Sequence, residues 1–259
     1  MICRCQWFLG AAAVLGLLAA QSARADSVPA VTFAQFTEVK PQPSHFQLKR
    51  FSTDQKFGLA TGITFFNQPS AGVAVNLDFS HITGAPTGDI RAHVFLSARS
   101  TTQAFASGAN GVQPFNSQLN QLIIRRDSDN KVLLEVDFKG NLVGPVSGHV
   151  ADLNASTVGG ANPNTPTADF VHFSSAIPEV QSFLSGSTGG EVALHFFNII
   201  PKLTLLGSGH NDEFLLGFAA GGSGVFSAAI VPEPGTLALG GIGVATLLGG
   251  LVRRRMATV

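Results

Sequence analysis

Histidines and carboxylates are the side chains of this 259-residue sequence that could carry out chemistry. The seven histidines are far apart, and no two stand at His-x-His spacing or at the i, i+4 spacing that helical metal sites use. We therefore expect ordinary structural histidines rather than metal ligands or catalytic bases. The seven are His45, His81, His93, His149, His172, His195 and His210.

Two acidic stretches offer oxygen ligands for a cation. Asp127 and Asp129 resemble the start of a calcium loop, and Asp212 with Glu213 forms a second acidic spot. Calcium takes about six to eight oxygens, supplied by a fuller loop with a glycine and a glutamate that are absent at these spacings. A tight turn explains both stretches, so we expect no metal and no cofactor, with Asp127 and Asp129 as weak calcium candidates.

Glu135 and Asp137 are the carboxylates best placed for acid–base work, because residues two apart share one face of a strand. A glycosidase needs two carboxylates that flank the bond in a cleft, usually with Trp or Tyr beside the sugar. The sequence has no Tyr, and its single Trp is Trp7. It also has no Gly-x-Ser-x-Gly elbow. We expect a solvated strand face and no catalytic residues, and we expect the short glycosylation pattern at Asn154 to be a chance match.

Alternating apolar and polar residues predict the elements that position these side chains. About ten to twelve short strands are bounded by Gly, Pro and Asn, and one short helix is expected within 175–185, with Pro178 in its first turn and Gly186 at its end. Residues 100–117 are expected to form a long loop, and 154–168 the least ordered stretch. The strands are expected at 31–36, 45–51, 57–66, 72–79, 89–99, 119–140, 141–153, 191–199, 202–206, 213–218 and 224–230. The pattern predicts an all-β, antiparallel β-sandwich with jelly-roll or Greek-key connections.

The clearest predicted unit is a hairpin within 119–140. A three-residue loop over 128–130 places Asp127 opposite Lys131 and Ile124 opposite Leu134, which keeps the apolar residues on one face. Such a loop needs its last residue in the left-handed region, where Asn is tolerated. We therefore predict a positive φ at Asn130.

The first 25 residues have the pattern of a signal peptide. Arg4 precedes an apolar run over 7–20, and Ala23 and Ala25 form a small-x-small cleavage site. Both cysteines lie in this segment, so the remaining chain has no disulfide or thiolate site. Residues 26–230 are then expected to form one exported domain. It carries 15 acidic and 11 basic residues, and this acidic balance argues against nucleic acid as a partner.

The C-terminal tail, 231–259, combines three features. The extended stretch 231–235 (Val231, Pro232, Glu233, Pro234 and Gly235) cannot continue a helix, because proline lacks an N–H. An uncharged apolar run over 236–252 follows, long enough to span a bilayer as a helix. The apolar run is followed by three arginines, Arg253, Arg254 and Arg255. A cluster of this kind marks the cytoplasmic side of a membrane span.

These three features in this order resemble the PEP-CTERM sorting signal of exported proteins from Gram-negative bacteria that make exopolysaccharide. The resemblance covers residues 231–256. It implies recognition by an exosortase, a membrane-embedded processing enzyme, and removal of the tail. The implied path runs through the export machinery and a transient anchor in the inner membrane to the cell surface or the extracellular space.

We therefore expect a non-enzymatic protein of the cell surface or extracellular matrix, associated with exopolysaccharide. Two alternatives remain open at this point. One is a carbohydrate-binding module, although Phe alone would supply the stacking rings. The other is a secreted hydrolase with carboxylates or histidines assembled from distant strands.

Overall fold

The computed structural model describes residues 30–51, 62–67, 71–157, 170–205 and 214–230. All strand pairings in this part are antiparallel, in one twelve-stranded sheet accompanied by one short helix. The all-β antiparallel class is therefore confirmed. The elements are β1 Ala30–Glu38, β2 Phe46–Phe51, β3 Gly62–Asn67, β4 Val73–Phe79, β5 Ile90–Ser100, β6 Phe105–Ser107, β7 Asn110–Arg126, β8 Val132–Pro145, β9 Ala151–Ser156, β10 Phe170–Ser174, α2 Pro178–Ser185, β11 Ser187–Ile200 and β12 Phe218–Ile230.

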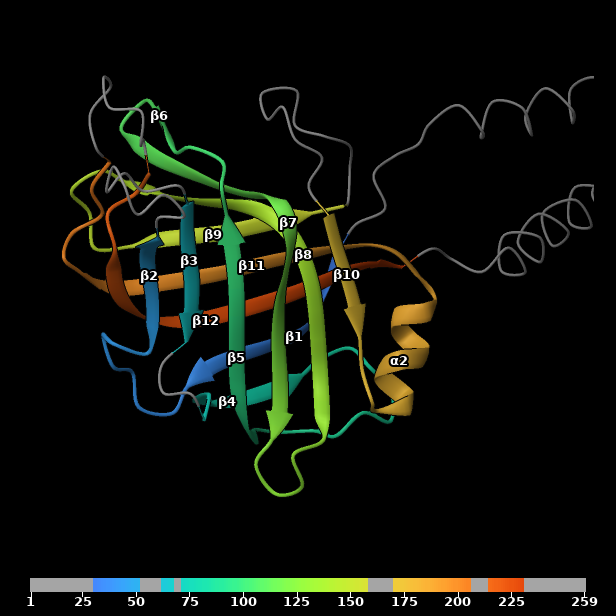
Figure 1. The fold of residues 1–259 in the computed structure, drawn as a ribbon. Coiled ribbons are helices and arrows are strands. Elements are labelled where there is room, and N and C mark those ends of the chain that lie inside the picture. Colours follow the sequence, from blue (N-terminus) through green and yellow to red (C-terminus); the bar gives the residue numbers. More distant parts are fainter. Residues whose placement is uncertain (1–29, 52–61, 68–70, 158–169, 206–213, 231–259) are drawn as a thin grey trace, which may run out of the picture.

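The sheet folds over on itself into two layers whose strands cross (Figure 1). The front layer has the order β2-β3-β5-β7-β8-β10, and the rear layer has the order β9-β11-β12-β1-β4. The pairs β8–β9, β4–β5 and β2–β12 join the layers. The helix α2 lies beside β10.

Phenylalanine fills the space between the layers. Phe65 packs edge-on against Phe196, with ring centroids 4.6 Å apart, and Phe46 lies 5.4 Å from the same ring. The rear strand β12 makes room for these rings with small residues. A Cβ on Gly222 would come within 2.8 Å of Phe46. The core thus combines bulky phenyl rings with a strand of mostly small residues, consistent with the close packing of protein interiors.

The predicted hairpin is confirmed in its register but not in its loop. Ile124 lies opposite Leu134, and Asn130 has a φ of 57°. The Arg126 N–H, however, donates to the Lys131 carbonyl at 2.9 Å, so the expected pairing of Asp127 with Lys131 is wrong. The loop is one residue longer. A register shift beside Leu134 restores the apolar face, as a β-bulge does.

The expected long loop over 100–117 is wrong, because β6 and most of the first half of β7 lie there. Strand β7 contains buried polar residues, which interrupt the apolar–polar alternation used to predict strands. Gln113 is buried and donates to the carbonyls of Thr102 and Pro114, and buried Asn120 donates to Phe115 and Phe138. These bonds satisfy polar groups that an apolar pattern does not reveal.

Two of the expected strands are reduced to one bridge between them, whereas the helix is confirmed. Within 202–205 and 214–218 the structure has one isolated bridge, Leu205 to Leu215, before β12 begins at Phe218. The helix α2 has proline in its first turn and Gly186 at its end. No helix among the residues described is long and apolar enough to cross a membrane. The expected signal peptide, 1–25, and apolar tail segment, 236–252, lie outside those residues.

Candidate functional site

The outer face of the front layer carries one continuous row of polar and aromatic residues. Cross-strand pairing links one residue from each of six strands, and each side chain is half-buried or exposed. We call this the polar row. Since neighbouring strands lie about 4.8 Å apart, it is about 24 Å long. Its members are Gln47, Phe66, Ser97, Gln121, Asp137 and His172.

A second row runs beside it and is basic. Lys49, Arg99 and Lys139 each stand two residues beyond a member of the polar row on the same strand, and so share its face. We call these three residues the cation row. The Lys49 Nζ lies 5.1 Å from the centre of the Phe66 ring, and the Arg99 guanidinium lies 4.2 Å from that of Phe51. Cation–π contacts of this kind hold the charged groups against the sheet.

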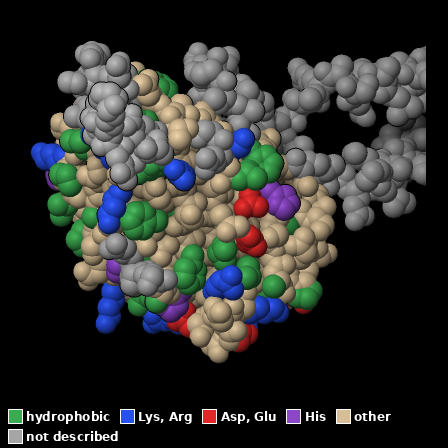
Figure 2. All heavy atoms as spheres, viewed as in Figure 1, with side chains coloured by type: hydrophobic (Ala, Val, Ile, Leu, Met, Phe, Trp, Pro, Cys, Tyr) green, Lys and Arg blue, Asp and Glu red, His purple; other side chains and the backbone are tan. Residues whose placement is uncertain are grey.

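The carboxylates Glu135 and Asp137 share this face, as the strand alternation predicted. The Gln121 Nε2 donates to Glu135 Oε1 at 2.7 Å and to Asp137 Oδ1 at 3.3 Å. His172 lies opposite Asp137 on β10. Figure 2 shows this face of the molecule, where acidic side chains gather with a histidine on the right and basic side chains are scattered over the rest of the face.

A groove of about 420 Å³ lies between β10, α2 and the start of β11. Its lining is mixed, with the polar residues Thr157, His172, Gln181 and Ser187 beside apolar Val171 and Leu184. His172 belongs to both the groove and the polar row. The acidic end of the polar row therefore meets the groove, and the groove gives that end of the face some depth.

Among the residues that the structure describes, three histidines pair with carboxylates from other parts of the chain. His93 Nδ1 lies 2.7 Å from Asp127 Oδ1, and His195 Nδ1 lies 2.6 Å from Asp152 Oδ1. These two pairs are open to solvent, with side chains between 35% and 55% exposed. They link neighbouring strands or a strand and a turn, which fits the structural role expected from the sequence.

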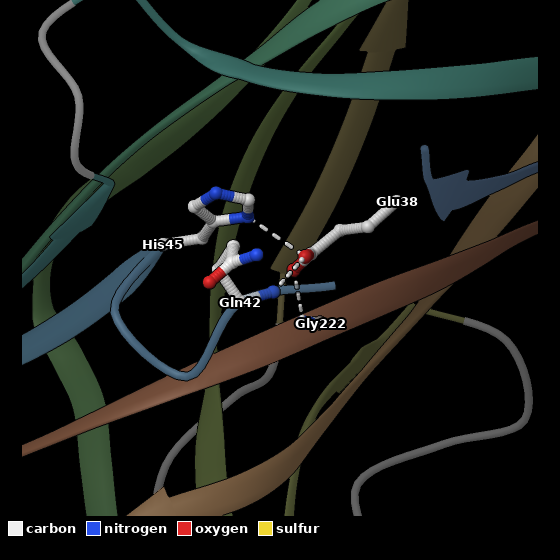
Figure 3. Close-up of polar contacts among 4 residues, drawn as sticks. All are labelled: Glu38, Gln42, His45 and Gly222. Carbon is white, nitrogen blue, oxygen red and sulfur yellow. Dashed lines mark hydrogen bonds and ion pairs between the residues drawn. The ribbon is translucent and has the colours of Figure 1, made fainter. Parts of the chain in front are cut away.

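The third pair, Glu38 and His45, differs because it is buried. The Glu38 side chain is 0% exposed, and one carboxylate oxygen lies 2.7 Å from His45 Nδ1. The carboxylate also accepts hydrogen bonds from the backbone N–H groups of Gln42 and Gly222 (Figure 3). Three donors thus compensate the burial of one carboxylate, and the group joins β1, the following turn and β12.

Glu38 is a buried charged residue that no motif in the sequence marks. The alternation of β1 does indicate that Glu38 is buried, because Glu38 follows Ala34 and Phe36 at every second position on the inward face. Its position is structural, since the three donors occupy the carboxylate and the groove lies elsewhere in the fold.

The weak calcium candidates lie at the tip of the β7–β8 hairpin, each with protein partners. Asp127 contacts His93, while Asp129 accepts from Arg126 at 3.3 Å and from the Lys131 N–H at 3.2 Å. Across the described ranges, no group of three His, Cys, Asp or Glu side chains could hold a metal ion. Asp212 and Glu213 lie outside those ranges.

Asn154 lies in β9, between β8 and β11, with an exposed side chain. His172 and His195 both face outward, as expected, and His149 bonds to the carbonyl of Ile199 at 2.8 Å. The signal-cleavage residues Ala23 and Ala25, the stretch 231–235, the arginines 253–255 and His210 lie outside the described residues.

Comparison with known proteins identifies the tail. A protein-family model for the PEP-CTERM protein-sorting motif matches residues 231–255. This motif indicates an exported protein that is anchored in a membrane and then processed by an exosortase. Neither the curated proteins nor the solved structures gave a match to the chain. The protein therefore carries a PEP-CTERM sorting motif, which begins directly after β12, the last strand that the structure describes.

Proposed function

We propose that this is a non-enzymatic protein of the cell surface or extracellular matrix, associated with exopolysaccharide. Residues 1–25 direct export, 26–230 form one domain of the β-sandwich class with jelly-roll or Greek-key connections, and 231–259 form the sorting tail. The observation that carries the proposal is the sorting motif at 231–255. The path runs through the inner membrane, with exosortase and the export machinery as partners.

The junction between domain and motif supports this assignment. β12 ends at Ile230, and the motif begins at Val231. Cleavage within the motif therefore leaves β12 with its partners in β1, β2 and β11. The β domain keeps its complete sheet when the tail is removed.

The arrangement of Glu135 and Asp137 supports a binding role over a hydrolytic one. Both carboxylates stand on one strand, on one open sheet face, and share a single donor, Gln121. A glycosidase instead places its two carboxylates on either side of the scissile bond. The same face favours the carbohydrate-binding alternative, because it offers hydrogen-bonding side chains beside half-buried rings.

The proposal is tested by following the full-length chain in cells with and without an exosortase. We expect a shortened product in the medium or the matrix fraction of the first cells, and an uncut, membrane-bound chain in the second. A variant with Pro232→Ala, Glu233→Ala and Pro234→Ala should behave as if the enzyme were missing.

A matched variant keeps the motif and changes three exposed residues of the domain, Lys40→Gln, Lys131→Gln and Lys202→Gln. It should be processed like the unchanged chain. Equal processing and location with and without exosortase would contradict the proposal. Release into buffer, with none retained by washed matrix, would contradict the association with exopolysaccharide.

A further inference from the structure

We propose that the outer face of the front layer binds an extended acidic polysaccharide that carries one negative charge on every second sugar. The inference rests on the proposed function and assigns the partner to a specific surface. The cation row, Lys49, Arg99 and Lys139, contacts the acidic groups. The polar row beside it contacts the hydroxyl groups between them.

The spacing of the cation row sets the charge repeat of the partner. Lys49 stands on β2, Arg99 on β5 and Lys139 on β8. The strands β3 and β7 lie between them, so consecutive cations are two strands, or about 10 Å, apart. A sugar chain with an acid on alternate units has a repeat of this size.

The three cations remain available to an external partner. None of them forms a salt bridge with a carboxylate in the part of the chain that the structure describes. Lys49 and Arg99 lie over phenyl rings, which fixes their positions without neutralising their charge. Their ammonium and guanidinium groups keep hydrogen-bond donors for an anion.

The polar row supplies the contacts that a sugar needs between its charges. Ser97, Gln121 and Asp137 offer hydroxyl, amide and carboxylate groups in one line across β5, β7 and β8. Phe66 adds a half-buried ring at the β3 end of the same line. With a length of about 24 Å, the row matches several sugar units rather than a single one.

The carboxylates of the face exclude a densely charged polymer. Asp137 belongs to the polar row and Glu135 lies two residues before it on the same face, so an anion above them would be repelled. A nucleic-acid strand carries a phosphate on every nucleotide and would place charges there. A chain with sparse charges places neutral sugar over the carboxylates, which then accept hydroxyl hydrogen bonds.

Affinity electrophoresis of the full-length chain in mild detergent tests this inference. The four probes are hyaluronan with one carboxylate per two sugars, polygalacturonate with one per sugar, uncharged dextran, and single-stranded oligo(dT). We expect hyaluronan to retard the chain more than the other three. The triple variant Lys49→Gln, Arg99→Gln, Lys139→Gln should bind hyaluronan more weakly, by a factor of up to about ten, because three solvent-exposed ion pairs are lost.

The matched control is the triple variant Lys40→Gln, Lys131→Gln, Lys202→Gln, which loses the same charge from exposed positions outside the two rows. It should bind hyaluronan like the unchanged chain. The double variant Glu135→Gln, Asp137→Asn should gain binding to polygalacturonate, because the repulsion is removed. All of these changes affect half-buried or exposed side chains, and thermal unfolding checks that each variant is folded.

Several results would overturn the inference. These are no retardation by hyaluronan, equal weakening by the control triple variant, or binding of oligo(dT) or dextran as tight as that of hyaluronan. If the chain is cut by exosortase and retained in matrix while hyaluronan binding fails, the proposed function stands and this surface assignment falls. If hyaluronan binding holds but processing does not depend on exosortase, the surface assignment stands and the proposed function falls.

Discussion

At the scale of single residues, Glu38 shows how a charged group can serve the fold. A buried carboxylate is costly unless donors surround it, and here two backbone N–H groups and one imidazole do so. The exposed pair His195 and Asp152 has a similar geometry but keeps much of its hydration, with side chains 51% and 55% exposed. The two pairs should therefore respond very differently to substitution.

We predict that Glu38→Leu lowers the free energy of unfolding by about 3 kcal/mol, because it leaves buried donors unpaired. Glu38→Gln keeps an acceptor oxygen and should cost less. Asp152→Asn should change stability by less than about 0.5 kcal/mol, as exposed substitutions usually do. Urea unfolding followed by circular dichroism measures all three. Equal effects of Glu38→Leu and Asp152→Asn would refute the bracing role of Glu38.

At the scale of elements, β12 fits between its neighbours because its glycines have no side chains. A Cβ on Gly224 would collide with the Phe36 ring and come within 2.8 Å of Leu194. Phe36 belongs to β1 and Leu194 to β11, the two strands that flank β12. The small residues of β12 therefore decide how closely the core rings can approach this layer.

Gly224→Ala should lower the free energy of unfolding by about 1–3 kcal/mol, the usual cost of overpacking a core. Ser223→Ala, at the neighbouring and partly exposed position, serves as the control and should change stability little. Thermal unfolding distinguishes the two. A Gly224→Ala variant as stable as the unchanged chain would show that the core can shift to admit the methyl group.

The same elements show how far the sequence determines the fold. Alternation located β4 and β5 closely, and it placed Glu135 and Asp137 on one face. It failed at the start of β7, where the buried side-chain amides of Gln113 and Asn120 donate to backbone carbonyls. Local pattern also says nothing about which distant strands become neighbours. The cation row and the polar row exist only because β2, β3, β5, β7, β8 and β10 lie in that order.

At the scale of the whole molecule, the two layers depend on the last strand. β12 pairs with β11, with β1 and, through its first residues, with β2, so it joins the rear layer to the front one. Its final residues pair with the start of β1, where Ala229 lies opposite Ala30. Processing of the tail must therefore stop short of this strand if the domain is to persist.

A chain that ends after Gly235 should unfold at the same urea concentration as the full-length chain. A chain that ends after Phe226 loses the last four residues of β12, including the buried Ala228 and Ala229. It should be less stable by about 3 kcal/mol, because several ladder hydrogen bonds and buried methyl groups are lost. Equal stability of the two shortened chains would mean that the end of β12 does not close the sheet.

The junction of β12 with the tail also has a mechanical consequence. While the tail holds the protein in the membrane, any drag on the domain is transmitted through Val231 into a strand of 13 residues. Hydrogen bonds to β1 and β11 flank that strand along most of its length. Tension along β12 loads these bonds in shear, all together, rather than opening them one after another. Until the exosortase processes the tail, the domain is thus attached through an element well suited to resist flow.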